Sequence, residues 1–363
     1  MLISTCMIVK NEEDNLRRAL KSVQGISDEL VIVDTGSTDR TVAIAQEHGA
    51  RVLHEAWSDD YAAARNVGVE AARGDFILYI DADEELRKED GPALRSTLES
   101  GRHDVVILDI VSRIGDSDKT NTVQYPRVFR RYADARFRYR LHEQIWESIA
   151  HHEPRVLSSE FRIIHHGYAL SGEAYRDKCE RNLALASRIV EAEPDNGFYL
   201  YHVGLGHLTL GRSEEGIRWL EKARRAGYDA PGCLNALAQA HQDQGRLPEA
   251  VALFRESARR CPSQHHAWAA LGDLYLKQQD YSEAESAFGR GLDVGRSEIH
   301  NDLAQLASVL WMKRGMAQLM MKDAATAASS LRRALELQLP DSEKRAVAER
   351  YLALAIKLGS GQM

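Results

Sequence analysis

The segment Glu29-Leu-Val-Ile-Val-Asp-Thr-Gly-Ser-Thr-Asp39 places a run of apolar residues directly before a polar turn. Such a run predicts a buried strand, and the turn predicts the N-cap of a helix. A second apolar run, Asp75-Phe-Ile-Leu-Tyr-Ile80, ends in the same way at Asp81-Ala-Asp83. Apolar strands that alternate with amphipathic helices are typical of a parallel sheet covered by helices.

The flanking sequence continues this alternation through residues 1–172. Further strands are predicted at Ile3–Val9 and Arg51–His54. Helices are predicted where Leu16, Leu20 and Val23 share one face, before Gly49, and over Ser58–Arg73. Beyond residue 103 the pattern is richer in strands and predicts an antiparallel extension of the sheet, at Asp104–Val111, Val123–Arg130 and Glu160–His165. We therefore expect one α/β domain over residues 1–172.

The sequence from Glu173 onward lacks strand signals and contains a repeat. Small residues recur at a spacing of 34, at Gly216, Ala250 and Ala284 and again at Gly204, Ala238 and Gly272. With Trp268-x2-Leu-Gly-x2-Tyr275, this pattern resembles the tetratricopeptide repeat (TPR). We expect residues 173–195 to form a connecting helix and residues 196–363 an all-α solenoid. It would hold about four repeats and a capping helix at Ser342–Leu358, because each helix pair needs neighbours to bury its apolar face.

Composition excludes several classes of protein. Charged residues make up 28% and apolar residues 44% of the chain, as in ordinary globular domains. The formal charge is −7 and no Lys/Arg block occurs, so we expect no nucleic-acid partner. No apolar run approaches the ~18 residues of a membrane span, and the N-terminus lacks the features of a signal peptide. The four cysteines are isolated, which favours a reducing compartment and a cytoplasmic location.

Two short motifs allow other interpretations. Asp34-Thr-Gly-Ser37 matches an aspartic-protease loop, but that enzyme needs two such loops, and here a helix follows. Ile80-Asp-Ala-Asp83 is similar to the opening of a haloacid-dehalogenase phosphatase, but those proteins carry it on their first strand and this chain on its fourth. Neither interpretation uses the rest of the sequence.

Four motifs together resemble the family 2 glycosyltransferases. They are, in order, Cys6-Met-Ile-Val-Lys-Asn-Glu12, Val31–Asp39, Ala64-Arg-Asn-Val-Gly68 and Tyr79-Ile-Asp-Ala-Asp83. The resemblance covers residues 1–172 and implies a GT-A fold, in which one α/β domain binds a nucleotide-sugar. In an open α/β sheet the ligand lies beyond the carboxyl ends of the strands, where these polar residues are predicted.

The resemblance implies roles for the donor-binding residues. Asp34 would accept a hydrogen bond from the base, usually uracil, and Ile8 and Val9 would lie against base and ribose. Glu12 belongs to the same motif, and Arg65 would lie near the base or the phosphates. The structural alternatives are an N-cap of the next helix for Asp34 and a surface ion pair for Arg65.

The acidic pair Asp81 and Asp83 is the motif that most specifically indicates a donor and metal site. The resemblance implies that Asp81 serves the donor and that Asp83 binds Mn²⁺ or Mg²⁺, hard cations that prefer carboxylate and phosphate oxygens. His165, or the adjacent His166, matches an additional metal ligand of some GT-A enzymes, in a His-x-Gly-Tyr segment that would close over the diphosphate. The alternatives are a solvated acidic turn and a structural histidine.

Glu143, within Arg138-Tyr-Arg-Leu-His-Glu-Gln144, is the candidate general base. The alternative is a structural ion pair with Arg127, Arg138 or Arg140. The resemblance implies an inverting transfer from a nucleotide-sugar donor, with a UDP-sugar favoured. The two-domain arrangement resembles bacterial transferases that modify bacteriocin peptides on Cys or Ser. The resemblance implies that the TPRs bind a polypeptide acceptor, and they could also form the interface of a homodimer. Other readings are a polysaccharide or lipid-linked acceptor, a non-catalytic scaffold and a sugar-nucleotide hydrolase.

Overall fold

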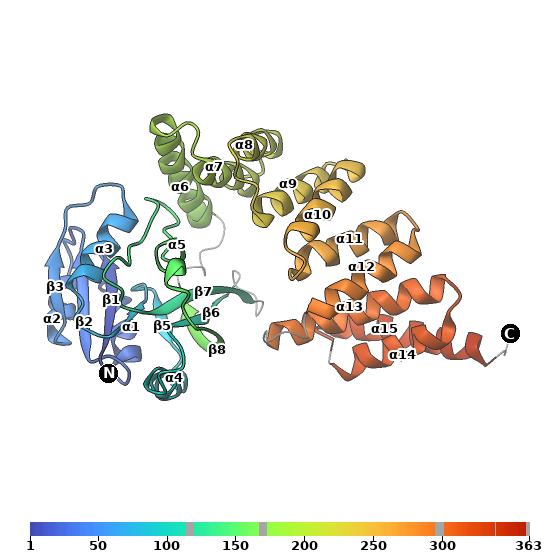
Figure 1. The fold of residues 1–363 in the computed structure, drawn as a ribbon, viewed down its shortest axis with the longest axis horizontal. Helices are drawn as coiled ribbons and strands as arrows, with labels where there is room; N and C mark the ends of the chain where they lie inside the picture. The colour runs from blue at the N-terminus through green and yellow to red at the C-terminus, as the bar shows by residue number, and fades with distance from the viewer. Residues whose placement is uncertain (114–119, 167–172, 295–300, 338, 361–363) are drawn as a thin grey trace. The chain divides into compact units, whose positions relative to one another are not determined.

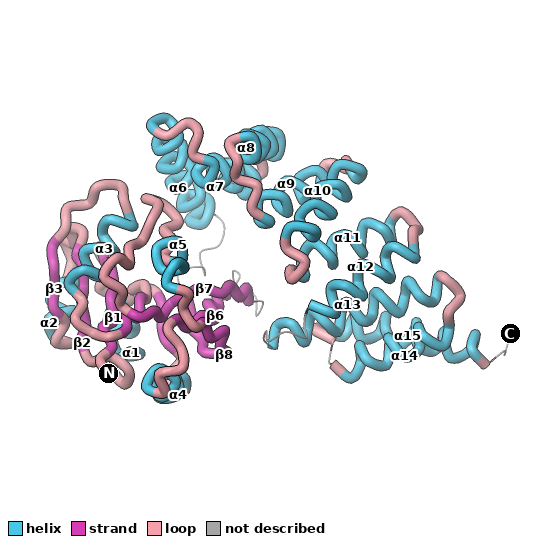
Figure 2. Tube along the Cα trace, viewed as in Figure 1, coloured by secondary structure: helices cyan, strands magenta, loops and turns pink. Residues whose placement is uncertain are grey.

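The computed structural model describes residues 1–113, 120–166, 173–294, 301–337 and 339–360 (Figure 1). The chain divides into two compact units, Met1–Lys178 and Cys179–Met363. All described strands lie in the first unit, and the described elements of the second are helices (Figure 2). An α/β domain followed by an all-α region confirms the predicted fold class. The division falls inside helix α6 (Glu173–Ala192), and the expected boundaries at 172 and 195 stay predictions.

The first unit is built on one sheet of eight strands, in the order β3-β2-β1-β4-β7-β6-β8-β5. The strands are β1 (Ile3–Val9), β2 (Glu29–Asp34), β3 (Arg51–His54), β4 (Phe76–Tyr79), β5 (Glu84–Leu86), β6 (Val105–Arg113), β7 (Thr120–Arg130) and β8 (Val156–His165). β3, β2, β1 and β4 run parallel. β7 is antiparallel to both β4 and β6, as predicted for the extension.

Two features of the extension differ from the prediction. β8 pairs parallel with β6, because the chain crosses back through α5 (Trp146–Ile149) before β8 begins. β5 was not predicted, since Glu84-Glu-Leu86 carries no apolar run. It is a strand because it pairs antiparallel with β8, in the register Glu84↔His165 and Leu86↔Ile163.

Helices cover both faces of the sheet, and each face has its own core. Neighbouring strand residues point to opposite sides, so Met7 and Cys6 enter different cores. The core that contains Met7 packs against α1 (Leu16–Val23), α2 (Thr41–Glu47) and α4 (Asp90–Glu99). The core that contains Cys6 packs against α3 (Tyr61–Ala71) and α5. Gly68 of α3 faces β1, where the Cys6 thiol lies 3.6 Å from its carbonyl oxygen.

The second unit is a series of antiparallel helix pairs. After α6 come α7 (Gly197–Thr209), α8 (Ser213–Arg225), α9 (Pro231–Asp243), α10 (Leu247–Arg260), α11 (His265–Lys277), α12 (Tyr281–Val294), α13 (Asn301–Met320), α14 (Ala324–Glu336) and α15 (Ser342–Gly359). In three of the pairs a glycine of the first helix faces a large residue of the second: Gly204 faces Leu220, Gly272 faces Phe288 and Gly315 faces Leu331. This contact explains the small and large positions of the repeat. None of the described helices is both long and apolar enough to cross a bilayer.

Candidate active site

Polar side chains gather at the carboxyl ends of the parallel strands. Glu12 follows β1, Asp34 ends β2, and Asp81 and Asp83 follow β4. Because β1 pairs with both β2 and β4, these ends are neighbours. This is the edge at which open α/β sheets bind ligands.

Asp34 organises the turn after β2. Its carboxylate is buried and accepts hydrogen bonds from the backbone N–H groups of Gly36 (3.3 Å) and Ser37 (3.2 Å). His54 Nδ1 lies 3.3 Å from Asp34 Oδ2. The expected N-cap alternative is wrong, since α2 begins only at Thr41, whose N–H is bonded by the Asp39 carboxylate.

Ile8 and Val9 form the end of β1 beside Asp34, with Val9 paired to Asp34 in the sheet. The Val9 side chain is buried in the core, while Ile8 is half-buried. The Val9 carbonyl accepts hydrogen bonds from both the N–H (3.0 Å) and the hydroxyl (3.1 Å) of Thr35. The structure thus leaves Ile8 as the more accessible of the two.

Glu12 belongs to the acidic group formed with Asp81 and Asp83. Burial raises the pKa of the Glu12 carboxyl, and the charges of Asp83 and Asp81 raise it further. Asn15 Nδ2 donates to Glu12 Oε2 at 2.9 Å. A concentration of carboxylates whose charges act on each other is a place where a cation is stabilised.

Arg65 of α3 connects two carboxylates that lie far apart in the sequence. Its Nε donates to Glu143 Oε1 at 2.6 Å, and its Nη2 donates to Asp81 Oδ1 at 2.7 Å. The guanidinium is only 8% exposed and lies near the rings of Tyr79 (5.3 Å) and Phe137 (5.6 Å). The alternative of a surface ion pair is therefore wrong, because Arg65 is a buried bridge.

Glu143 lies in the loop between β7 and α5, and residues of α3 hold this loop in place. An isolated bridge between Arg138 and Gln144 closes the loop, and Asn66 bonds both the carbonyl and the N–H of Phe137. The alternative that paired Glu143 with Arg127, Arg138 or Arg140 is wrong in its partner, which is Arg65. No described residue hydrogen-bonds the second oxygen of Glu143, Oε2.

A second buried arginine supports Asp81. Arg127 of β7 donates from Nη2 to Glu84 Oε1 at 2.6 Å, and its Nη1 lies 4.0 Å from Asp81 Oδ2. Burial opposes ionisation of Asp81, but the Arg65 and Arg127 guanidiniums outweigh it and lower its pKa to about 2. Asp81 is therefore a carboxylate at neutral pH.

Asp83 and His165 are brought together by the pairing of β5 with β8. His165 Nε2 lies 3.1 Å from Asp83 Oδ2, and its Nδ1 lies 3.2 Å from Ser112 Oγ. His166 instead contacts Glu85, with 3.1 Å between Nε2 and Oε2. The geometry thus favours His165 over His166 as the partner of Asp83. The Gly167-Tyr168 part of the expected closing segment lies outside the described residues.

The donor set at Asp83 and His165 fits a divalent cation. A carboxylate oxygen and an imidazole nitrogen face one another, and Ser112 orients the ring through its other nitrogen, as in many metal sites. Two protein donors meet directly here, and phosphate oxygens of a ligand would be suitable further donors.

Sequence reasoning missed Asn66, Glu84 and Ser112 as supporting residues. The Arg127–Glu84 pair joins residues 43 apart through the sheet, so no local pattern signals it. Asn66 belongs to the motif Ala64–Gly68, but its partner Phe137 is 71 residues away. These contacts depend on strand order, which the sequence does not state.

Comparison with known proteins identifies the families of the two parts of the chain. Residues 4–160 match the profile of glycosyl transferase family 2. Residues 201–265, 235–298 and 269–343 each match a tetratricopeptide repeat profile. The chain is a family 2 glycosyltransferase with C-terminal TPRs.

Several relatives share parts of this glycosyltransferase. A TPR repeat-containing protein of Synechococcus elongatus is 32% identical over 286 residues, which cover 75% of this chain and 70% of the relative. The SPbeta prophage-derived glycosyltransferase SunS of Bacillus subtilis is 28% identical over 225 residues, so the match covers 60% of this chain and about half (52%) of SunS.

The solved structure of S. aureus TarS 1–349 in complex with UDP-GlcNAc is 19% identical and covers 76% of this chain and 89% of that one. Its TM-score of 0.43 is too low to support a conclusion about this chain.

Proposed function

We propose that this glycosyltransferase moves a sugar from a UDP-sugar to a side chain of a peptide or protein, with Mn²⁺ or Mg²⁺ and with inversion at the anomeric carbon. The observation that carries the proposal is the acidic edge of the sheet. There Asp81 and Asp83 follow β4, and His165 at the end of β8 contacts Asp83. Arg65 bridges Asp81 to Glu143, which lies in the loop between β7 and α5.

The donor would lie across the ends of β1, β2 and β4. The Asp34 carboxylate accepts hydrogen bonds from the turn at the end of β2. We assign Asp34 to bind the nucleotide base, with Ile8 and Val9 beside it. Asp81 is ionised and faces the same edge, so it serves the ribose or the diphosphate. Asp83 and His165 would hold the divalent ion, with Glu12 nearby. When bound, that ion supplies Lewis-acid stabilisation of the departing diphosphate.

Glu143 is the proposed general base. Arg65 fixes one oxygen, and the other has no hydrogen bond among the described residues, so it can accept a proton. The acceptor hydroxyl or thiol gives its proton to that oxygen and forms the new bond to the anomeric carbon. The bond from that carbon to the diphosphate oxygen breaks on the opposite face, which gives inversion.

The repeats supply a surface for a polypeptide acceptor. A groove of about 530 Å³ lies between α10, α11 and α12. It is lined by apolar side chains that include Trp268, by one acid, Glu283, and by three arginines, Arg255, Arg259 and Arg290. No described carboxylate lies within 4.0 Å of these three guanidiniums. We assign the groove to an acidic segment of the acceptor, on the basis of charge complementarity.

The repeat provides its own comparison for this groove. One repeat earlier, at positions shifted by 34 residues, the equivalent groove carries Glu221 and Glu256 in place of Arg255 and Arg290. There Glu256 pairs with Arg224 at 2.7 Å and Glu221 with Arg225 at 3.8 Å. The two grooves occupy equivalent positions in successive repeats and differ in charge.

The metal assignment is tested with two neighbouring acids. We expect Asp83→Asn to abolish Mn²⁺-dependent binding of the donor, measured by calorimetry with UDP-, GDP- and dTDP-sugars, because it removes one of few anionic ligands. Glu85→Gln is the matched control, since Glu85 pairs with His166 as Asp83 pairs with His165. Unchanged Mn²⁺-dependent binding in Asp83→Asn would contradict the assignment. Absence of binding for every sugar nucleotide would favour the scaffold alternative.

The acceptor assignment is tested with two arginines at the same repeat position. Arg259→Glu should reduce transfer to a polypeptide acceptor, while slow hydrolysis of the donor continues, because none of the proposed donor-binding residues lines the groove. Arg225→Glu, in the equivalent groove, should leave transfer unchanged. Equal transfer by both variants would remove the support for a polypeptide acceptor and favour a polysaccharide one.

A further inference from the structure

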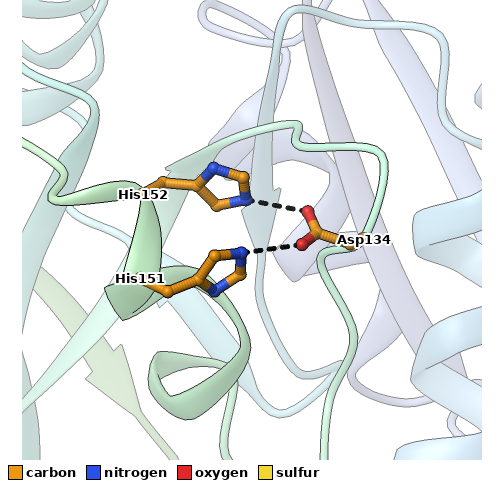
Figure 3. Close-up of side chains that lie close together, drawn as sticks. All are labelled: Asp134, His151 and His152. Atoms are coloured by element: carbon orange, nitrogen blue, oxygen red, sulfur yellow. Dashed lines mark hydrogen bonds and ion pairs between the residues drawn. The ribbon is translucent and has the colours of Figure 1, made fainter.

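Outside the candidate active site, Asp134, His151 and His152 form a second cluster of metal-ligand side chains. His151 Nε2 lies 2.9 Å from Asp134 Oδ2, and His152 Nε2 lies 2.8 Å from Asp134 Oδ1. Figure 3 shows both rings pointing their nitrogens at the carboxylate between them. All three donor atoms lie within 4.8 Å of one another, and this is the only such group of three among the described residues.

The cluster belongs to the opposite edge of the sheet. Asp134 follows β7, which runs antiparallel to β4, so the end of β7 lies beside the start of β4 at Phe76. The two histidines lie in a short 3-10 helix, Ala150–His152, directly after α5. The cluster is therefore separate from the Asp83–His165 pair, which follows the other end of β4.

The side chains are arranged as a preformed site. The His152 ring stacks on Tyr132, with 4.0 Å between ring centroids and an angle of 5° between the planes. This stacking fixes the direction of Nε2 before any ion binds. Asp134 and His151 are more than half exposed, which leaves room for water to complete the coordination.

The ligand chemistry points to a particular class of metal. Two imidazole nitrogens and one carboxylate oxygen suit Zn²⁺, which takes three protein ligands and a water in a tetrahedron. Ligands about 2.0–2.2 Å from the ion lie roughly 3.3–3.6 Å from each other in a tetrahedron. The two nitrogens contact different oxygens of Asp134, at 2.9 and 2.8 Å, and one donor atom of each residue lies within 4.8 Å of the others. Modest side-chain rotations would therefore bring one oxygen and both nitrogens to tetrahedral separations.

We propose that Asp134, His151 and His152 bind a zinc ion, which clamps the two ends of the segment that carries Glu143. Asp134 precedes this segment and the histidines follow it, so one ion would tie residues that are 17 and 18 positions apart. Closing such a loop reduces the conformational freedom of the chain between its ends. The clamp would stabilise the loop that Arg65 holds from the other side.

The test measures zinc binding directly on the full-length, metal-free protein. ZnCl₂ is titrated by calorimetry at about pH 7.5. We expect one bound zinc to be lost in the double variant His151→Ala/His152→Ala. The matched control, His265→Ala/His266→Ala, removes another adjacent pair of histidines and should keep that zinc. Running the titration also in Asp83→Asn separates zinc bound at the candidate active site.

A second readout does not depend on stoichiometry. Zinc should slow hydrogen exchange in peptides that cover residues 134–152 of the wild type and leave those peptides unaffected in the double variant. Asp134→Asn, which keeps both histidines, tests the same site if the double variant shows an altered circular dichroism spectrum. Equal zinc stoichiometry in wild type, the double variant and Asp134→Asn would overturn the proposal. Exchange that zinc does not slow in the wild type would overturn the clamp.

Discussion

Replacing Arg65 with methionine tests whether one buried guanidinium holds the candidate site together. The change removes two charge-assisted hydrogen bonds, of 2.6 Å to Glu143 and 2.7 Å to Asp81. Methionine keeps much of the packing against Tyr79 and Phe137. Removing one partner of a buried ion pair costs about 3–5 kcal/mol, so we expect the free energy of unfolding of the N-terminal unit to fall by that amount.

The burial of the two carboxylates predicts how the lost free energy of unfolding divides between the Arg65–Glu143 and Arg65–Asp81 pairs. The Glu143 side chain is 13% exposed, so its coupling to Arg65 should be about 2–3 kcal/mol, the range for a hydrogen bond to a charged group. Asp81 is 33% exposed, and its coupling to Arg65 should be smaller, about 1 kcal/mol. The pKa of Asp81, lowered to about 2 although burial raises it, reflects the combined attraction of Arg65 and Arg127 and agrees in sign with this coupling.

Double-mutant cycles measure both couplings, with Arg65→Met combined in turn with Glu143→Gln and Asp81→Asn. Hydrogen exchange in peptides of β1 and β4 reports the N-terminal unit separately from the repeats. The control cycle pairs Arg95 with Glu99, a solvent-exposed contact of α4 whose coupling should be about 0.3–0.5 kcal/mol. An Arg65–Glu143 coupling no larger than that of the control would refute the bridge.

Three further predictions concern stability and donor binding. Asp104→Asn should lower the free energy of unfolding by about 1–2 kcal/mol at neutral pH, because the carboxylate accepts hydrogen bonds from two arginines. Those arginines hold the pKa of Asp104 below its ordinary value, so the advantage of wild type over Asp104→Asn, measured by thermal unfolding, should shrink as the pH falls below about 4. Gly74→Ala should cost about 1–3 kcal/mol in denaturant titrations, since its Cβ would lie 2.6 Å from the Ser4 backbone nitrogen, whereas Gly25→Ala meets no atom within 4 Å and should be tolerated. Asp34→Asn should weaken binding of a UDP-sugar at least about tenfold by calorimetry, and equal affinity would remove Asp34 from the base site.

Much of the candidate site could be predicted from the sequence, because its residues stand at the ends of apolar runs. Asp34, Asp81 and Asp83 follow strands whose pattern is local, and parallel strands bring such ends to one edge. The partners of these residues could not be predicted in the same way. The alternative for Glu143 paired it with Arg127, Arg138 or Arg140, whereas it contacts Arg65, which is 78 residues away.

Local sequence therefore determined which elements form and which polar residues end them, since apolar spacing acts within a few residues. It also determined the repeats, because a period of 34 places the same small and large residues in contact in successive helix pairs. Only the tertiary structure decided that β5 pairs with β8, which joins Asp83 to His165, and that α3 places Arg65 between two carboxylates. Strand order and helix placement depend on how much apolar surface the whole chain buries. No single segment determines that amount, because it depends on contacts between segments that are far apart in the sequence.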